Sequence, residues 1–213
     1  MAAAVPDHYF SRRPRARHRE EVLRATIQGR SFVFHSDAGV FSRGAIDRGT
    51  ELLAASLVLA PDAHVLDLGC GYGVLGIVAA TLAPNGRVVM TDVNERAVDL
   101  AARNLRENHV PHADVRLGAF YEPVAGEAFD AIVCNPPIRA GKAVVFRIVD
   151  EAPQRLRPGG ALWIVARTKQ GARSLEARMA AVFGACETVA RGSGYRVLRS
   201  RRRPAGDATR NFI

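Results

Sequence analysis

The sequence predicts an α/β fold, in which a mostly parallel sheet carries helices on both faces. Three observations favour this class. From residue 63 onward, short apolar runs typical of strands alternate with segments of helical periodicity, as in parallel sheets with helical crossovers. A glycine-rich turn follows the first of these strands. Near the end, Gly192-Ser193-Gly194 separates two strand-like runs, so a closing hairpin should add one antiparallel strand.

The expected elements follow in chain order. Residues 31–35 read as a strand, and residues 47–59 carry apolar residues at helical spacing. Strands of the main sheet are then expected at residues 64–68, 88–91, 115–117, 128–134, 161–166, 187–190 and 195–200. Helices are expected near residues 73–82, 95–108, 141–156 and 174–183. Turn signals separate them: Pro84-Asn85-Gly86 ends a helix, and Arg157-Pro158-Gly159-Gly160 makes a tight turn.

Positive charge gathers at both ends of the chain. Its 213 residues suit one domain, with a net charge of +9. Residues 1–30 hold seven arginines against three acids, and residues 191–213 hold seven against one. We therefore expect a basic, poorly ordered segment over 1–25, a folded domain over 26–200 and a basic flexible tail over 201–213. Such ends suit a polyanionic partner, and solvated tails without a partner are the alternative.

Composition argues against several classes of protein. No apolar run approaches the ~20 residues that a membrane span needs, and the N-terminus does not read as a signal peptide, so we expect a cytoplasmic protein. Cys70, Cys134 and Cys186 lie far apart without a Cys-x-x-Cys pair, so neither a disulfide framework nor a metal site is expected. Monomer and homodimer both stay open.

The glycine-rich turn is Val65-Leu66-Asp67-Leu68-Gly69-Cys70-Gly71-Tyr72-Gly73. It follows a strand at the edge where open α/β sheets bind ligands, and glycines there let the backbone approach a ligand closely. Gly71, Gly73 and Gly76 also form the G-x-G-x-x-G pattern of nicotinamide-binding proteins, with Asp92 about 20 residues further on. The glycine pattern alone therefore does not decide the ligand.

Two acids accompany this turn. Asp67 lies two residues before Gly69, where a carboxylate suits a ligand that carries a cationic amino group. The run from Val65 resembles the S-adenosylmethionine-binding loop of Rossmann-like methyltransferases. Asp92 ends the second strand of the main sheet, where a carboxylate can accept hydrogen bonds from both hydroxyls of a ribose. Asn94 is expected to cap the next helix.

The tetrad Asn135-Pro136-Pro137-Ile138 directly follows the fourth strand of the main sheet. The Asn135 side-chain oxygen and the Pro136 carbonyl can each accept a hydrogen bond from an exocyclic amine, and Pro137 stiffens the turn. Two acceptors on one NH₂ draw its lone pair out of conjugation and aim it at a methyl donor. Catalysis would then depend on orientation and electrostatics. Taken alone, the tetrad could also be an ordinary strand terminator.

These motifs together resemble the small-domain (MTS-type) methyltransferases, and within them the ribosomal small-subunit RNA guanine-N2 methyltransferases. The likeness runs from about His8 to Ser200. Besides the glycine loop it is carried by His8-Tyr9-Phe10-Ser11, Gly39-Val40-Phe41-Ser42, Ile46-Asp47-x-Gly49-Thr50, the segment 135–142, Leu162-Trp163-Ile164-Val165, Lys169-Gln170-Gly171-Ala172 and Gly194-Tyr195-Arg196-Val197.

The resemblance implies a seven-stranded Rossmann-like fold, S-adenosylmethionine as cofactor, and methyl transfer to the N2 amine of guanine. The partner would be ribosomal RNA or the small ribosomal subunit. The cofactor-binding residues would be Asp67, Gly69, Cys70, Gly71, Gly73, Asp92, Val93, Ala119, Phe120 and Asn135. The catalytic residues would be Asn135, Pro136 and Pro137, and the substrate-binding residues Phe41, Ile138, Arg139 and Lys142.

The sequence departs from the family pattern at two positions. Ala119 stands where members often carry an acid for the adenine amine, so backbone or apolar groups must contact adenine here. Ile138 stands where many amine methyltransferases carry an aromatic that stacks on the base, so Phe41 or Arg139 becomes the candidate for that contact. Longer members also carry an extra N-terminal domain, so this chain is expected to bind RNA in a different way from them.

Other functions remain open on the residues. The same Asn-Pro-Pro loop methylates adenine N6 in DNA or a glutamine amide in protein. A non-catalytic RNA-binding protein that kept the fold is a further alternative, against which the intact Asp67, Asp92 and Asn135 argue. Asp67 and the Asn135 loop disfavour a nicotinamide oxidoreductase.

Overall fold

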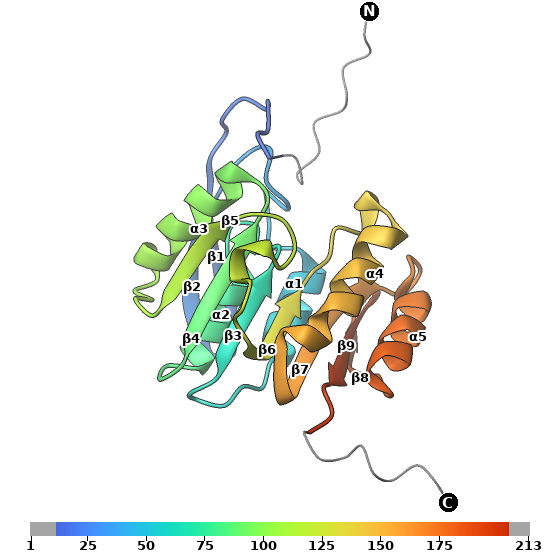
Figure 1. Cartoon of the computed structure of the whole chain (residues 1–213). Helices are drawn as coiled ribbons and strands as arrows, with labels where there is room; N and C mark the ends of the chain where they lie inside the picture. Colours follow the sequence, from blue (N-terminus) through green and yellow to red (C-terminus); the bar gives the residue numbers. More distant parts are fainter. Residues whose placement is uncertain (1–11, 205–213) are drawn as a thin grey trace, which may run out of the picture.

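Seven strands form the central sheet of the structure, a computed structural model that describes residues 12–204. Figure 1 shows their order across the sheet, β5-β4-β3-β6-β7-β9-β8. In that order the strands are Ala113–Leu117, Arg87–Asp92, His64–Leu68, Phe129–Cys134, Leu156–Arg167, Tyr195–Arg201 and Glu187–Gly192. β9 runs antiparallel to β7 and β8, and the remaining pairs are parallel. The predicted sheet, with one antiparallel strand, is confirmed.

The strand order changes direction at β3. The chain passes from β3 outward to β4 and β5, then returns to place β6 on the other side of β3. In open α/β sheets such a reversal opens a crevice beyond the carboxyl ends of the strands. β3, β4 and β6 are almost entirely buried, which explains their nearly unbroken apolar sequences.

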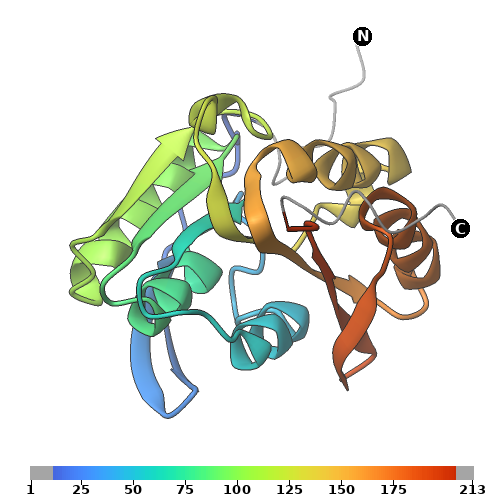
Figure 2. The same ribbon diagram turned by 60° about the horizontal axis from the view of Figure 1, so that its bottom comes forward.

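Five α-helices cover the two faces of this sheet. Figure 2 shows α1 (Arg48–Ser56), α2 (Val74–Leu82) and α3 (Glu95–Glu107) on one side, and α4 (Lys142–Glu151) and α5 (Ala172–Phe183) on the other. Each layer packs against its own apolar cluster, one per face of the sheet. The Asn94 side chain accepts hydrogen bonds from the backbone of Arg96 and Ala97, so its predicted capping role is confirmed.

A separate antiparallel hairpin, β1 (Glu21–Ile27) and β2 (Arg30–Ser36), lies beside α3 (Figure 1). The side chains of Asn104 on α3 and of Asn108, the residue that caps its C-terminus, each bond to both an N–H and a C=O of β2. These bonds satisfy backbone groups on the outer edge of β2, which would otherwise stay unpaired. The helix therefore fixes the hairpin to the domain.

Some expected boundaries need correction. The expected limit at residue 25 falls inside β1, so the N-terminal segment is ordered from earlier than predicted. β1 was missed because only Ile27 at its end is buried, and because the strand follows a stretch rich in arginine. At the other end, Arg201 still belongs to β9. The matched segment 8–11 and residues 205–213 lie outside the described part of the chain.

The remaining differences are small. α4 stops at Glu151, and the stretch to residue 156 that was expected to continue it is a 3₁₀ turn over Ala152–Gln154 and the start of the long β7. Two further 3₁₀ turns span Glu122–Val124 and Ile138–Ala140. Within residues 12–204, no helix is both long enough and apolar enough to span a membrane.

Candidate active site

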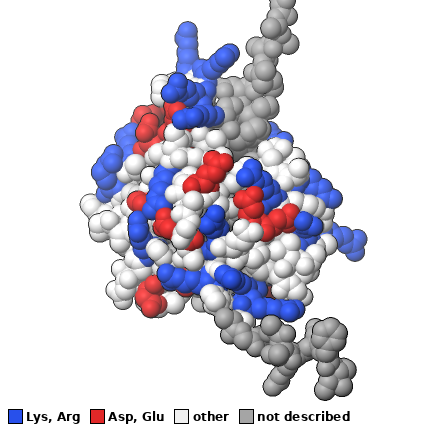
Figure 3. Space-filling view, viewed as in Figure 1, with Lys and Arg blue, Asp and Glu red and all other residues white. Residues whose placement is uncertain are grey.

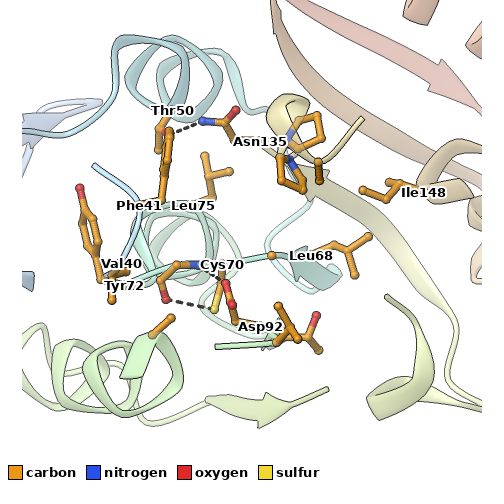
Figure 4. A pocket seen from close by; sticks show the side chains of 18 of the residues that line it. Val40, Phe41, Thr50, Leu68, Cys70, Tyr72, Leu75, Asp92, Asn135 and Ile148 are labelled. Carbon is orange, nitrogen blue, oxygen red and sulfur yellow. Dashed lines mark hydrogen bonds between the residues drawn. The ribbon is translucent and has the colours of Figure 1, made fainter. Parts of the chain in front are cut away.

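A cavity of about 380 Å³ opens at the carboxyl ends of β3, β4 and β6, where the reversal of strand order predicts a ligand site (Figure 4). Its size is within the usual range for small-molecule sites. Eleven of the residues predicted to bind cofactor or substrate line it: Phe41, Gly69, Cys70, Gly71, Asp92, Val93, Ala119, Phe120, Asn135, Pro136 and Pro137. Five do not, and they are considered one by one below.

The glycine loop forms one wall of the cavity. The N–H groups of Gly69 and Cys70 both donate to the Thr91 carbonyl at 2.9 Å, which joins the loop to the end of β4. Gly69 and Gly71 have φ of 73° and 56°, in the left-handed region that favours glycine. A Cβ on either residue would meet no atom within 4 Å. Backbone conformation, rather than crowding, therefore requires these two glycines, and their open side is available to a ligand.

Asp92 connects this loop to the start of α3. Its Oδ2 accepts a hydrogen bond from Gly71 N at 2.8 Å, and its Oδ1 accepts one from Asn94 N at 2.9 Å. Burial raises the pKa of Asp92, although these backbone donors act in the opposite direction. A carboxylate offers about four acceptor positions, so Asp92 can still accept a hydrogen bond from a ligand hydroxyl. The position agrees with the predicted contact to a ribose.

Asp67 does not lie where the sequence suggested. Its side chain is fully buried, and it is absent from the cavity wall. Oδ2 accepts a hydrogen bond from Gly76 N, in the first turn of α2, at 2.7 Å. Oδ1 has no partner among the described residues, and burial raises the pKa of the carboxyl to about 7. Asp67 thus holds the N-terminus of α2 beneath the loop, and its contact to a ligand amino group stays a prediction.

Gly73 is likewise outside the cavity wall. It caps α2 with φ of 98°, and a Cβ there would lie 3.3 Å from Cβ of Ala101 on α3. Its role is therefore to let the two helices approach closely rather than to contact a ligand.

Another part of the cavity wall is formed by Ala119 and Phe120, which follow β5. Phe120 has a positive φ of 49°, and the Arg147 guanidinium lies 4.0 Å above its ring. Gly118 also lines the cavity, and a Cβ on it would lie 2.4 Å from Cγ of Pro123. This wall offers apolar and backbone groups and no acidic side chain, as expected from Ala119.

The Asn135 side chain is fixed by two hydrogen bonds. Its Nδ2 donates to Thr50 Oγ1 at 2.8 Å and to Asp47 Oδ2 at 3.2 Å (Figure 4 shows the Thr50 bond). Because a carboxylate can only accept, the atom that faces Asp47 must be the amide nitrogen. Among the described residues nothing donates to Asn135 Oδ1, so this oxygen stays free to accept a hydrogen bond from a ligand.

The two prolines that follow form a tight turn. The Pro136 carbonyl accepts a hydrogen bond from Ile138 N at 2.8 Å, around Pro137 with φ of −73° and ψ of 78°. These angles are those of an inverse γ-turn. The Pro136 carbonyl keeps a second lone pair, so it can still accept a bond from a ligand amine.

The remaining predicted substrate residues divide into two kinds. Phe41 lines the cavity, as predicted. Ile138 does not: it packs against the apolar cluster under α4 and α5, and its contact with a substrate stays a prediction. Arg139 and Lys142 are exposed outside the cavity, where they can meet only a ligand that extends beyond it.

Some residues of the site had no assigned role beforehand. Thr50 lines the cavity and Asp47 lies behind it, and both belong to the motif Ile46-Asp47-x-Gly49-Thr50 that the sequence already singled out. Among residues 12–204, no three His, Cys, Asp or Glu side chains meet in a way that could hold a metal ion. The cavity therefore combines a glycine loop and the acid Asp92 with the fixed amide oxygen of Asn135. This combination suits a ligand bound by the loop and the acid, next to an amine that donates a hydrogen bond to the amide oxygen.

Comparison with known proteins identifies a family and several similar proteins. The model of the methyltransferase small domain family matches residues 31–199. Uncharacterized protein YbxB of Bacillus subtilis is 34% identical over 201 residues, which cover 93% of this chain and 100% of that protein. Ribosomal RNA small subunit methyltransferase C of Pseudomonas aeruginosa is 35% identical over 175 residues, or 77% of this chain and 49% of that protein.

Among solved structures, the chain is similar to the T. thermophilus 16S rRNA N2 G1207 methyltransferase in complex with AdoMet and guanosine. The TM-score is 0.77 and the identity 32%, over 86% of this chain and 51% of that one. The chain thus spans about half the length of these two named methyltransferases, and the whole length of the B. subtilis relative.

Proposed function

The chain belongs to the methyltransferase small domain family, and on that premise we propose that it methylates the exocyclic N2 amine of a guanine in small-subunit ribosomal RNA, with S-adenosylmethionine as methyl donor. The observation that carries the proposal is the Asn135 amide. Its nitrogen is engaged by Thr50 and Asp47, and its oxygen is left as an acceptor at the cavity that Asp92 and the glycine loop also line.

The residues of the cavity fit S-adenosylmethionine. Gly69 and Gly71 leave open space beside the backbone, which suits the close approach of the methionine portion. Asp92 has lone pairs left for the ribose hydroxyls, and Ala119 with Phe120 offers an apolar slot for the adenine. When bound, this cofactor supplies a methyl group on a positively charged sulfur.

The chain's own groups would orient the acceptor. The Asn135 Oδ1 and the Pro136 carbonyl each accept one N–H of the target amine, so its nitrogen lone pair turns toward the methyl carbon. The cofactor would supply the methyl group to this nitrogen in exchange for its bond to sulfur, and the methylated nitrogen would then lose one proton to solvent. No base is needed before transfer, and the contribution of the protein is orientation and electrostatic stabilisation.

A group of exposed cations next to the site supports RNA as the substrate. Arg139 and Lys142 follow β6, Arg167 ends β7, and Lys169 and Arg173 follow β7; we call these five residues the basic rim. The stretches 131–149 and 157–175, which contain them, hold no Asp or Glu. None of the five forms a salt bridge among the described residues, unlike Arg147 and Arg178 nearby.

Figure 3 shows Lys and Arg side chains, with some Asp and Glu between them, over the part of the surface that α4 and α5 form. Cations without acidic partners, at the edge of a catalytic cavity, suit the phosphates of a nucleic acid. A glutamine amide in a protein would make no use of them. The choice of guanine over adenine, and of the small subunit, rests on the likeness to the two named ribosomal RNA methyltransferases.

The test is methyl transfer from labelled S-adenosylmethionine to ribosomal subunits, total RNA, DNA and protein in parallel, followed by nucleoside analysis. We expect N2-methylguanosine in small-subunit RNA. N6-methyladenine in DNA or a methylated glutamine would replace the proposed substrate and keep the cofactor. A protein that binds the cofactor and RNA but labels none of these would instead favour a non-catalytic RNA-binding role.

A further inference from the structure

An asparagine that must accept a hydrogen bond faces a problem of orientation. Its amide oxygen and NH₂ are nearly equal in size, and a rotation by half a turn about the last side-chain bond would present donors to the target amine instead of an acceptor. We propose that Asp47 and Thr50, supported by Tyr195, are positioning residues that lock the Asn135 amide with its oxygen available to the substrate. This inference rests on the proposed function.

The lock consists of the Asp47 carboxylate, which can only accept and so sets the orientation of the amide, and the Thr50 hydroxyl, which holds the amide in place from the same side. Asp47 Oδ2 and Thr50 Oγ1 each accept a hydrogen bond from Asn135 Nδ2, at 3.2 Å and 2.8 Å. Rotation of the amide would place its oxygen against the carboxylate oxygen of Asp47, and two acceptors repel each other. Thr50 is only 8% exposed, so water has little access to replace the lost contacts.

Asp47 is itself held from three directions. It is the N-cap of α1, and its Oδ2 also accepts hydrogen bonds from Gly49 N at 2.9 Å and Thr50 N at 3.2 Å. Its Oδ1 accepts a hydrogen bond from the Tyr195 hydroxyl at 2.9 Å. The partial positive charge of the helix N-terminus further favours a carboxylate here. These hydrogen bonds hold the Asp47 side chain in place beside Asn135.

Gly49 makes this arrangement possible. A Cβ at Gly49 would lie 2.6 Å from Cε1 of the Tyr195 ring and 2.8 Å from Asp47 Oδ2. Any side chain would therefore push Tyr195 away from Asp47. The motif Ile46-Asp47-x-Gly49-Thr50 is explained by this packing: it supplies the cap, the space for Tyr195 and the hydroxyl that holds Asn135.

Thr50→Val tests the lock, because valine keeps the shape of threonine and lacks only the hydroxyl. We expect the maximal turnover of Thr50→Val to fall by about tenfold, the effect of one lost hydrogen bond, with unchanged affinity for S-adenosylmethionine. Thr50→Ser should recover most of this loss. Thr81→Val is the matched control, since the Thr81 hydroxyl bonds only to Val78 O within α2, away from the site.

A double-mutant cycle separates positioning from general damage. In the Asn135→Ala background, Thr50→Val should slow turnover by less than about twofold, because the group that it orients is gone. An equal loss in both backgrounds would overturn the inference. If Thr50→Val does not fold, Tyr195→Phe replaces it. The loss of turnover in Tyr195→Phe should be smaller than that expected for Thr50→Val, and it should also disappear in the Asn135→Ala background.

Side-chain amide NMR gives a readout that needs no substrate. The Asn135 NH₂ signals, identified by their loss in Asn135→Ala, should shift and exchange faster with solvent in Thr50→Val and stay unchanged in Thr81→Val. Signals that do not respond to Thr50→Val would overturn the lock even if the protein methylates guanine. A labelled product other than N2-methylguanosine would overturn the proposed function and leave these NMR and cycle results to decide the lock.

Discussion

The backbone N–H of Gly71 donates to Oδ2 of Asp92 at 2.8 Å, so the glycine loop after β3 and the acid at the end of β4 form one unit. The second carboxylate oxygen is engaged by Asn94 N, at the start of α3. Asp92 therefore has two tasks, since it shapes the loop and offers its remaining lone pairs to a ligand.

Asp92→Ala should weaken S-adenosylmethionine binding strongly. Two charge-assisted hydrogen bonds to ribose would be lost and the loop would be loosened, which together should raise Kd by about 100-fold. Isothermal titration calorimetry measures this directly. The matched control is Asp99→Ala, which removes an exposed carboxylate from α3 and should leave Kd unchanged. An Asp92→Ala variant that binds as tightly as wild type would remove Asp92 from the cofactor site.

Asn135→Ala should affect turnover and spare cofactor binding. The variant loses the acceptor that orients the target amine, and loss of one such group in other enzymes reduces turnover by about 100-fold or more. We expect the Kd for S-adenosylmethionine to stay within about twofold, because the glycine loop and Asp92 are untouched. Single-turnover methyl transfer and calorimetry check the two values. Equal losses in both would show that Asn135 serves cofactor binding rather than orientation.

Much of the fold could be predicted because its signals are local. The apolar runs of β3, β4 and β6 and the Gly192-Ser193-Gly194 turn each identify an element by themselves. β1 was missed because its stability comes from its pairing with β2, and β2 is held by side chains of α3 that lie some 70 residues further along the chain. Such long-range bonds leave no local pattern.

In the site too, features that depend on local sequence could be predicted, and features that depend on long-range contacts could not. Gly69 and Gly71, which the glycine pattern singled out, do line the cavity, and their contact with a cofactor stays a prediction. The direction of a side chain was harder: Asp67 points beneath α2, away from the cavity. The bonds that hold Asn135 could not be foreseen, since Thr50 and Asp47 lie 85 and 88 residues before it.

The basic rim predicts that the affinity for RNA depends on salt concentration. Arg139→Ala combined with Lys169→Ala should weaken RNA binding and lower the slope of log K against log salt by about 1.5, because two phosphate contacts are lost. Turnover at saturating RNA should change little, since neither residue lines the cavity. Binding titrations at several salt concentrations test this. A matched control removes an exposed cation far from the rim: Arg106→Ala, on α3, should leave the slope unchanged.

Asp67 predicts how stability depends on pH. Burial raises the pKa of its carboxyl from 3.8 to about 7 in the folded protein, so between these values the native state holds a proton that the unfolded chain has released. Because the folded-state pKa is the higher one, the contribution of this group to the free energy of unfolding is complete below about pH 4. It is lost as the pH rises through about 7.

The free energy of unfolding of Asp67→Asn should therefore increase relative to that of the wild type as the pH rises. Asparagine keeps an oxygen for Gly76 N and never ionises, so the variant's advantage should grow by up to about 4 kcal/mol between about pH 4 and about pH 8. Urea unfolding at both pH values measures it, with Asp99→Asn as the exposed control. An advantage that does not change with pH would mean that the carboxyl titrates normally in the native state.

Cofactor affinity gives a second check, because Asp67→Asn should bind S-adenosylmethionine almost as wild type does if the acid supports α2, and much more weakly if it contacts the amino group.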